Sequence, residues 1–462
     1  MIPLSFAQRR LWFLGQLEGP SATYNVPWLL RLSGALDALA LRAALNDLVE
    51  RHESLRTVFP SVDGEPYQCV LPAAEAEVVL HQLDLEAGEV EERAVEAAAG
   101  VFDLAGEIPI RAYLFRTAPD EHVLLLLLHH IASDGWSLGP LARDLSAAYN
   151  ARVGGEGPAW DALPVQYTDY TLWQRELLGA EGDPESVVSR QLEYWRAQLS
   201  DLPEELRLPT DRPRPAVAGH DGGIHEFRLS ADLHARLADL ARENQCTMFM
   251  VVQAALATLL TRLGAGTDIP IGSVIAGRTE EALEDLIGFF VNTLVLRTDT
   301  TGDPTFRELL ARVRATDLDA YAHQDVPFER LVEDLNPTRT TAHHPLFQVM
   351  LAFQNNGSDD TNLTNVKTTW HDIGTGTAKF DLDFGMTETH TVDRQPAGIT
   401  AHVQYLSDLF DHSTVVSIAD RLARVLEAVT TDPGQSLSQV EVLDPGEREL
   451  LLHAWNDTFV AH

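Results

Sequence analysis

The stretch VLLLLLHHIASDG, residues 123–135, carries the strongest structural signal in the chain. It begins with six apolar side chains in a row, a pattern typical of a strand that is buried on both faces. His129 and His130 follow directly, and Asp134 and Gly135 come four and five residues after His130. Because a buried strand delivers the residues at its end to a fixed point, often between layers, we predict a functional site centred on His130.

An imidazole at such a position can accept or release a proton near neutral pH, which suits catalysis. The plain alternative is a histidine satisfied inside the core, which is the better interpretation of a lone histidine. We predict no metal, because adjacent histidines point in different directions and no Cys or Glu cluster completes a zinc set at the usual spacing. A serine triad is disfavoured, since the sequence contains no GxSxG nucleophile elbow.

The rest of the chain alternates short apolar runs with longer helical patterns, which indicates the α/β class. We predict helices at 7–17, 36–53, 138–151, 231–244, 247–263, 306–322 and 415–429, and a mostly helical connection at 173–199. We predict strands at 27–32, 123–128, 269–275, 346–353 and 399–406. The stretch 356–377 is rich in Asn, Thr, Gly and Asp, so we expect a surface loop there.

The length of 462 residues favours two or three domains, or one fold that is duplicated. Hydrophobic residues make up 45% and charged residues 22%, as in a folded globular protein. The formal net charge of −35 argues against non-specific binding to nucleic acid or to an anionic membrane, both of which require a basic surface.

The cysteines and the apolar runs of the sequence indicate in which cellular compartment the protein is expected. Cys69 and Cys246 form no CxxC pair, so we expect no disulfide framework and a reduced, cytoplasmic setting. The first residues lack the basic flank and long apolar stretch of a signal peptide. The most apolar helical run, 248–260, is too short to span a bilayer, which takes about 20 apolar residues.

Seven segments of the chain together resemble a known family. They are SFAQRRLW (5–12), RHESLRTVF (51–59), LHHIASDGWS (128–137), YTDYTLW (167–173), IGFFVNT (287–293), HQDVPFE (323–329) and HPLFQ (344–348). HxxxDG is typical of the chloramphenicol acetyltransferase-like acyltransferases, and HHxxxDG of the condensation-type domains of nonribosomal peptide synthetases. All seven segments stand in the order of the condensation domains, so the chain resembles that family over nearly its whole length.

The resemblance implies a fold and a division of the chain. The expected fold is two chloramphenicol acetyltransferase-like lobes that form a V-shaped pseudo-dimer with a central tunnel. We expect the N-terminal lobe at 1–175 and the C-terminal lobe at 176–445, with an inter-lobe connection at about 176–215. Residues 446–462 resemble the linker that leads into a downstream adenylation domain.

The resemblance also implies the reaction. Two carrier proteins, one upstream and one downstream, would present aminoacyl or peptidyl thioesters on 4'-phosphopantetheine arms. The amine of the acceptor attacks the donor thioester, and an amide bond forms. The domain itself binds no cofactor, and the product belongs to secondary metabolism, such as an antibiotic or a siderophore.

The motif residues receive roles on the same basis. His130 would accept a hydrogen bond or a proton from the attacking amine, or stabilise the charged intermediate. Gly135 would lend its backbone N–H to the oxyanion, although a simple turn glycine is an equal alternative. Asp134 would be structural and pair with Arg278, with Arg297 as the second candidate partner.

Further residues are assigned more loosely. We expect His129 to hold the loop through a backbone contact, and we expect three arginines to brace the N-terminal lobe: Arg9, Arg51 and Arg56. Lining of the substrate tunnel is predicted for Trp136, Ser137, Gly288, Phe289, Asn292, Gln354 and Asn355. Ordinary loop-capping amides are the alternative for Asn292, Gln354 and Asn355.

Other activities of the same fold stay open. Epimerisation domains share HHxxxDG, but PFER and HHPLFQ fit condensation better. Ester formation, with a hydroxyl in place of the amine, is an open alternative, and heterocyclisation is excluded because it requires DxxxxD. A non-catalytic module that recruits a tailoring enzyme is the rival from another class. The sequences RHESLRTVF and HHIASDGWS resemble those of the condensation-domain subtype that takes an L-configured donor.

Overall fold

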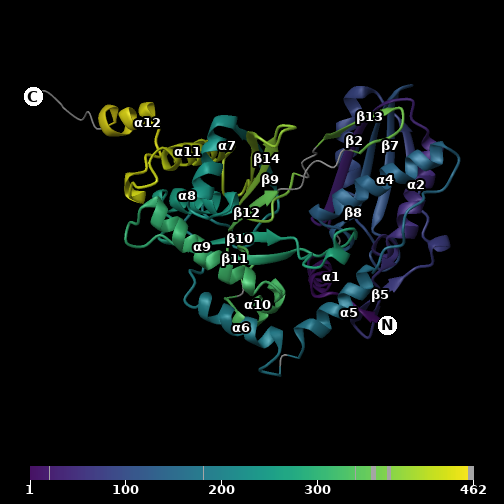
Figure 1. Cartoon of the computed structure of the whole chain (residues 1–462), viewed down its shortest axis with the longest axis horizontal. Helices are drawn as coiled ribbons and strands as arrows, with labels where there is room; N and C mark the ends of the chain where they lie inside the picture. Colours follow the sequence, from purple (N-terminus) through teal and green to yellow (C-terminus); the bar gives the residue numbers. More distant parts are fainter. Residues whose placement is uncertain (20, 181, 339, 355–360, 372–375, 456–462) are drawn as a thin grey trace, which may run out of the picture.

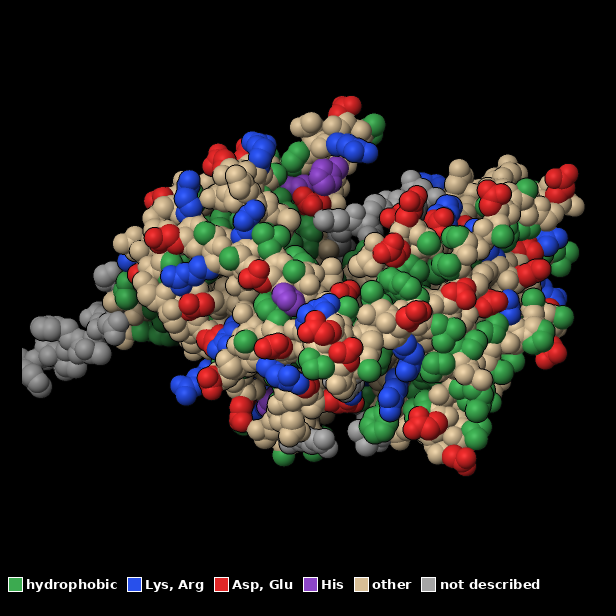
Figure 2. Space-filling view, turned by 60° about the horizontal axis from the view of Figure 1, so that its bottom comes forward, with side chains coloured by type: hydrophobic (Ala, Val, Ile, Leu, Met, Phe, Trp, Pro, Cys, Tyr) green, Lys and Arg blue, Asp and Glu red, His purple; other side chains and the backbone are tan. Residues whose placement is uncertain are grey.

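The computed structural model describes the chain except for residues 20, 181, 339, 355–360, 372–375 and 456–462. Two bodies, each built around a β-sheet, stand side by side and are joined along one edge (Figure 1). In the space-filling view a notch separates them at the top, and acidic side chains are scattered over both (Figure 2).

The first body contains a five-stranded sheet in the order β13-β2-β8-β7-β6. Its strands are β2 (Asn25–Gly34), β6 (Leu80–Asp84), β7 (Ile110–Ala118), β8 (Glu121–His129) and β13 (Val366–His371). Its helices are α2 (Ala38–Arg51), α3 (Val90–Ala98) and α4 (Leu138–Val153). Alternate leucines of β8 pack into two different clusters, one with α2 and α4 and one with α3. Strand β8 is therefore buried on both faces, as its unbroken apolar run predicts.

The second body contains a six-stranded sheet in the order β11-β10-β12-β14-β15-β9. Its strands are β9 (Gly222–Leu229), β10 (Asp268–Ile275), β11 (Asn292–Asp299), β12 (Val349–Gln354), β14 (Leu382–His390) and β15 (Pro396–Leu406). Its helices are α7 (Ala231–Glu243), α8 (Met248–Arg262), α9 (Phe306–Ala322) and α11 (His412–Thr431). One apolar cluster joins these helices to the sheet, and α8 lies at its centre, because almost every side chain of that helix is buried.

Short elements connect the two bodies along their shared edge (Figure 1). They are α1 (Phe6–Glu18), α5 (Tyr167–Leu178), α6 (Val187–Gln198), α10 (Phe328–Leu335) and a small sheet of β1 (Ile2–Pro3), β3 (Thr57–Val58), β4 (Ser61–Val62) and β5 (Glu65–Val70). Arg10 of α1 pairs with Glu329 of α10 at 3.1 Å. The segment 276–291 leaves β10 and inserts Ile287 into the core of the first body. A last short helix, α12 (Pro445–Glu449), follows the second body.

The expectation of a surface loop at 356–377 is wrong for part of that stretch. Residues 366–371 form β13, which pairs antiparallel with β2 over six residues and becomes the edge of the first sheet. The pattern VKTTWH carries β-branched and aromatic side chains suited to a strand. Its exposed residues are the polar Lys367, Thr369 and His371 together with Trp370, and the polar ones are what made the segment resemble a loop.

The other predicted helices and strands are present with small shifts at their ends. The connection at 173–199 is two helices, α5 and α6, separated at Gly179, where the backbone turns into a positive φ of 74°. Strand β12 begins at Val349 rather than at 346. The sequence patterns missed several elements with mixed polarity: α3, α10, β5, β6, β7, β9, β11 and β14.

In the described part of the chain, no single helix has the length and apolar content needed to cross a membrane. Helices α7 and α8 meet that test only as a pair, and they are bent by 102° relative to each other.

Candidate active site

His130 directly follows β8, in a short 3-10 turn formed by residues 130–132. Its backbone N–H donates to the carbonyl of Tyr24 at 2.8 Å. Its Nδ1 lies 2.7 Å from the carbonyl oxygen of Ser133, which can only accept, so Nδ1 carries the proton in the neutral ring. The lone pair is therefore on Nε2, and His130 presents a hydrogen-bond acceptor to its surroundings.

The His130 ring lies where the two bodies meet. Phe289 of the 276–291 segment packs against it, with the ring centroids 4.7 Å apart. Burial lowers the pKa of His130 to about 4, and the charge of Lys379 acts in the same direction. The residue nevertheless keeps part of its surface accessible. Near neutral pH the imidazole is thus unprotonated, in a residue that is partly exposed.

His129 points into the first body instead. It is buried, its Nδ1 accepts a hydrogen bond from the N–H of Ile131 at 3.1 Å, and its ring meets the edge of Phe102. Burial lowers its pKa to about 3. The structure places His129 in the backbone contact that we expected, and away from the surface of the junction.

Asp134 is fully buried and binds the second body. Its two oxygens accept from Nη1 and Nη2 of Arg278 at 2.9 and 3.0 Å. They also accept from the N–H of Phe290 at 3.0 Å and from the N–H and hydroxyl of Ser137 at 2.9 and 2.8 Å. Every lone pair of the carboxylate is thus engaged by protein, and none faces a ligand.

Arg278 completes this network from the second body. Its guanidinium lies 4.2 Å from the centroid of the Phe290 ring, and its side chain is 5% exposed. Gly277, directly before it, has a positive φ of 66°, and a Cβ there would lie 1.9 Å from the Phe290 carbonyl oxygen. The second candidate partner, Arg297, is paired with Asp268 at 2.7 Å instead.

Ser137 and Gly288 fasten the two bodies together. The Ser137 hydroxyl oxygen lies 2.9 Å from the carbonyl oxygen of Gly288 and accepts from the N–H of Gly288 at 3.1 Å. Ser137 is buried in this network, so its predicted place on a tunnel wall is not where the structure puts it. Gly288 lies against Tyr167, whose hydroxyl donates to the carbonyl of Phe289 at 2.5 Å.

Gly135 and Trp136 lie on the open side of the same turn. Gly135 is exposed, its φ is outside the left-handed region, and a Cβ there would meet no described atom within 4 Å. No backbone strain therefore requires a glycine at this position. Trp136 is half-buried.

The side-chain amide of Asn292 is engaged by protein and not, as we expected, free to line the substrate tunnel. Both N–H groups of the Asn292 side chain donate to protein carbonyls, those of Gln324 and Val326, and its oxygen accepts from the N–H groups of Thr293 and Phe328. Asn292 therefore caps a loop and has no donor left for a pantetheine amide. Gln354 ends β12, but its side chain is outside the described residues, as is all of Asn355.

The arginines of the second motif brace the first body, as we expected. Arg51 pairs with buried Asp144 at 2.8 Å, and Asp144 also bonds His52 at 2.8 Å. Arg56 donates to the carbonyl of Leu71. The structure gives the exposed Arg9 no comparable contact within the residues described.

Comparison with known proteins agrees with the motifs. The family described as Condensation domain matches residues 1–452. Over 98% of its length the chain is 57% identical to a probable non-canonical nonribosomal peptide synthetase of Salinispora arenicola and 54% identical to a dimodular nonribosomal peptide synthase of Bacillus subtilis. It spans only 6% and 19% of the lengths of these two relatives.

This chain belongs to the condensation-domain family of nonribosomal peptide synthetases.

A solved structure extends the match to the fold. The crystal structure of the X-domain from teicoplanin biosynthesis superposes with a TM-score of 0.89 at 39% identity, covering 96% of this condensation domain and 98% of that chain. The two bodies are the chloramphenicol acetyltransferase-like lobes of a pseudo-dimer, so we call them the N-terminal and C-terminal lobes.

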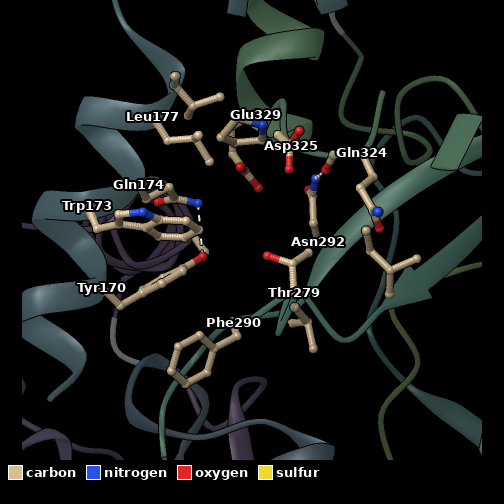
Figure 3. A pocket seen from close by; sticks show the side chains of 16 residues that line it. Tyr170, Trp173, Gln174, Leu177, Thr279, Phe290, Asn292, Gln324, Asp325 and Glu329 are labelled. Atoms are coloured by element: carbon tan, nitrogen blue, oxygen red, sulfur yellow. Dashed lines mark hydrogen bonds between the residues drawn. The ribbon is translucent and has the colours of Figure 1, made fainter. Parts of the chain in front are cut away.

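A separate pocket lies near the edge that joins the lobes (Figure 3). Its labelled lining residues are Tyr170, Trp173, Gln174, Leu177, Thr279, Phe290, Asn292, Gln324, Asp325 and Glu329. The two carboxylates are already engaged, Asp325 by Gln191 at 2.7 Å and Glu329 by Arg10. Phe290 lines this pocket while its neighbour Phe289 faces His130. The pocket thus opens on the other side of the 276–291 segment from the imidazole.

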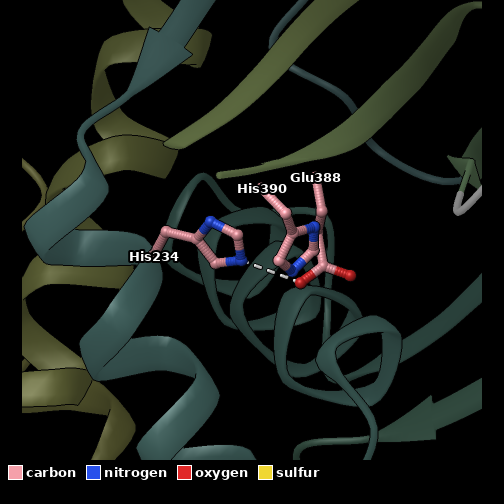
Figure 4. A group of neighbouring side chains, drawn as sticks. All are labelled: His234, Glu388 and His390. Atoms are coloured by element: carbon pink, nitrogen blue, oxygen red, sulfur yellow. Dashed lines mark hydrogen bonds and ion pairs between the residues drawn. The ribbon is translucent and has the colours of Figure 1, made fainter. Parts of the chain in front are cut away.

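A cluster of His234, Glu388 and His390 has the residue types of a metal site (Figure 4). Its hydrogen bonds argue against that function. The N–H of Gly398 donates to Nδ1 of His234 at 3.3 Å, so the proton of that ring is on Nε2, which bonds Glu388 at 2.8 Å. A metal at Nε2 would force Nδ1 to carry a proton facing another N–H. The cluster is a structural contact between α7 and the β14–β15 hairpin.

Three residues of the site region were not found from the sequence. The backbone carbonyl of Tyr24 accepts from His130, and the hydroxyl of Tyr167 bonds Ser5 and the carbonyl of Phe289. No periodicity in the sequence reveals such contacts. Lys379 lies between strands, 249 positions after His130 in the printed sequence, and no spacing connects the two. The contact of Lys379 with Tyr24 across the lobes can be found only from the fold.

Proposed function

We propose that this condensation domain forms an amide bond between a donor aminoacyl or peptidyl thioester and the amine of an acceptor aminoacyl thioester. The observation that carries the proposal is the state of His130. Its Nδ1 proton is held by Ser133, and its Nε2 lone pair stands at the junction of the lobes on a ring that is neutral near pH 7. Such a ring can accept from an amine.

The chemistry demands little more than this. A thioester is already activated, and an α-amine with a pKa of about 8 is a good nucleophile once neutral. His130 accepts a hydrogen bond from the attacking amine and takes its proton once the new C–N bond has made that nitrogen positive. Positioning supplies effective molarities of about 10⁵ M or more, and base help adds about 10²–10⁴-fold.

The rigid network behind the ring serves positioning. Asp134 is structural in this proposal, because its oxygens bind Arg278, Ser137 and the backbone of Phe290 rather than a substrate. The N–H of Gly135 remains a candidate donor to the oxyanion, and open space surrounds its Cα.

The wider assembly is part of the proposal. Upstream and downstream carrier proteins deliver the substrates on 4'-phosphopantetheine arms to the two mouths of a tunnel between the lobes. The N-terminal lobe consists of residues 1–175 together with β13 and the inserted Ile287, and the C-terminal lobe consists of most of the remaining residues up to 445. Residues 446–462 connect to an adenylation domain. The donor is L-configured. Two unpaired cysteines, Cys69 and Cys246, are consistent with a reducing cytoplasm.

The test uses small thioesters in place of carriers. Wild-type protein and His130→Ala are mixed with an aminoacyl N-acetylcysteamine donor and an aminoacyl acceptor, and the dipeptide is measured by mass. We expect the variant to lose about 10²–10⁴-fold in rate. Equal rates for both proteins would contradict the proposal.

A second candidate function has an observation of its own. The X-domain that resembles this chain at 39% identity has a counterpart, also from teicoplanin biosynthesis, solved in complex with OxyB. Recruitment of a partner enzyme without catalysis is therefore the rival. It predicts no amide product from wild-type protein with any donor and acceptor, whereas ester formation or epimerisation would give its own product of distinct mass or configuration.

A further inference from the structure

Lys379 reaches from the C-terminal lobe to the loop that holds His130. It lies just before β14, and its Nζ is 4.9 Å from the centroid of the Tyr24 ring, in the N-terminal lobe. The carbonyl of Tyr24 accepts the backbone N–H of His130. The charge of Lys379 also acts to lower the pKa values of His129 and His130.

The ammonium of Lys379 has no ion pair and no hydrogen bond among the described residues, although the chain carries a net charge of −35. Charged or titratable groups face it from four elements: Asp383 on β14, Arg10 on α1, His129 at the end of β8, and His130 in the turn that follows.

The surroundings make this cation reachable yet enclosed. The side chain keeps an exposed surface, while burial by the enclosing lobes lowers the pKa of Lys379 to about 8. Asp383 opposes this shift and Arg10 adds to it. A solvent-accessible cation that has an aromatic face beside it, and no ion pair among the described residues, is available to a ligand that brings negative charge.

The amino-acid usage of the chain adds a second observation. Lys367 and Lys379 are its only lysines, and all its other cationic side chains apart from histidine are arginines. Lysine differs from arginine in carrying a compact point charge with freely rotating donors, and in losing its proton more readily when enclosed. A lysine beside Tyr24, in a chain that uses arginine at nearly every other cationic position, suits a site where a compact ammonium is required.

We propose that Lys379 is a second catalytic residue of the condensation reaction, whose ammonium stabilises the oxygen of the thioester carbonyl as it becomes negative. This inference rests on the proposed function. The acceptor nitrogen attacks the carbonyl carbon, the C–O π electrons move to oxygen, and Lys379 stabilises that alkoxide without giving up its proton. The alkoxide then re-forms the carbonyl and expels the donor thiolate, which receives the proton that His130 took from the amine. One amide and one thiol result.

The experiment compares Lys379→Met with a matched control, Lys367→Met, whose lysine is exposed on β13. All proteins are assayed with the same carrier-bound donor and acceptor. Loss of one preorganised donor to an oxyanion costs about 10²–10³-fold in kcat. We expect such a loss in Lys379→Met with an unchanged donor KM, and full activity in the control. A Lys379→Met rate within twofold of wild type, or a loss confined to KM, would overturn the inference.

The pH profile of Lys379→Arg separates catalysis from folding. Wild-type activity should fall above about pH 8 as Lys379 loses its proton, whereas an arginine stays charged. We expect Lys379→Arg to keep measurable activity and to lose this alkaline fall. An unchanged alkaline fall in Lys379→Arg would overturn the inference even if Lys379→Met failed to fold. If wild-type protein formed no amide product in this assay, that result would instead contradict the proposed function itself.

Discussion

Two buried aspartates, one in each lobe, differ in what surrounds them. Asp134 in the N-terminal lobe is fully buried and is bonded by both terminal nitrogens of Arg278, by Ser137 and by a backbone N–H. Asp317 in α9 of the C-terminal lobe is equally buried, but its Oδ1 accepts only from Gln253 at 3.1 Å, and its Oδ2 has no hydrogen-bond partner among the described residues.

Burial alone therefore does not decide the environment of a carboxyl group, because the groups packed around it differ. Burial raises the pKa of Asp317 to about 7, because no cation replaces the water that it lost. Asp134 has its own guanidinium and a full set of donors, which replace the water that its carboxylate lost on burial. The site is thus held by a charge pair that spans both lobes, whereas the C-terminal core contains a carboxyl that is easily neutralised.

The largest expected effect comes from breaking the Asp134 pair. Asp134→Ala leaves Arg278 buried without its partner, which costs about 3–5 kcal/mol of unfolding free energy, and this is measured by chemical denaturation. Full stability combined with loss of activity would show that Asp134 acts in the chemistry instead.

The matched control for Asp134→Ala is Asp268→Ala. Asp268 forms a bond of the same kind with Arg297, but the two side chains are 32% and 22% exposed. Because this pair is partly exposed to solvent, the control should lose less unfolding free energy than Asp134→Ala. Equal losses in both variants would contradict the role given to burial.

A smaller effect is expected where the lobes touch at Gly288. A Cβ there would lie 2.2 Å from Cδ2 of the Tyr167 ring, so Gly288→Ala must displace Tyr167 or the 276–291 segment. We expect a loss of about 1–3 kcal/mol, as for other overpacked positions, measured by denaturation. An unchanged midpoint would mean that this contact between the lobes is loose.

The raised pKa of Asp317 also predicts how the stability of the protein depends on pH. The folded protein retains a proton on Asp317 that the unfolded chain releases, so wild-type stability should fall as pH rises from about 4 to about 7, by at most about 1.4 kcal/mol per pH unit. Asp317→Asn cannot ionise, so its stability should fall less over this window. Denaturation midpoints at four pH values test this, and parallel curves for both proteins would contradict the raised pKa.

The smallest effect on stability is expected at Gly135. Its φ is ordinary and its Cβ would meet no described atom, so Gly135→Ala should change the unfolding free energy by no more than about 0.5 kcal/mol. Its activity is the informative readout. A drop in rate at unchanged stability would place the methyl group in the path of a substrate, and an unchanged rate would leave Gly135 a turn residue.

The sequence predicts the centre of the site better than its surroundings. The end of β8 and the position of His130 follow from a strand buried on both faces, which leaves an unmistakable apolar run. The motif resemblance supplied the partnership of Asp134 with Arg278, and the structure brings the two together although they are 144 residues apart.

What escaped prediction depends on contacts between distant segments. Strand β13 resembled a loop because only the fold supplies its partner, β2. Asn292 resembled a substrate ligand until its four hydrogen bonds were visible. Lys379 gave no local signal at all, since its meaning comes from lying opposite Tyr24 across the junction of the lobes.

The role of His130 in amide bond formation is tested most directly by following acyl transfer between two carrier proteins. Wild-type protein is mixed with a donor carrier protein loaded with an aminoacyl group and an acceptor carrier protein loaded with another, and both carriers are weighed by intact mass spectrometry after a single turnover. With wild-type protein we expect the acceptor carrier to gain the mass of the donor acyl group and the donor carrier to return to its free thiol. With His130→Ala we expect both masses to stay unchanged. Transfer that proceeds equally well in His130→Ala would contradict this role of His130.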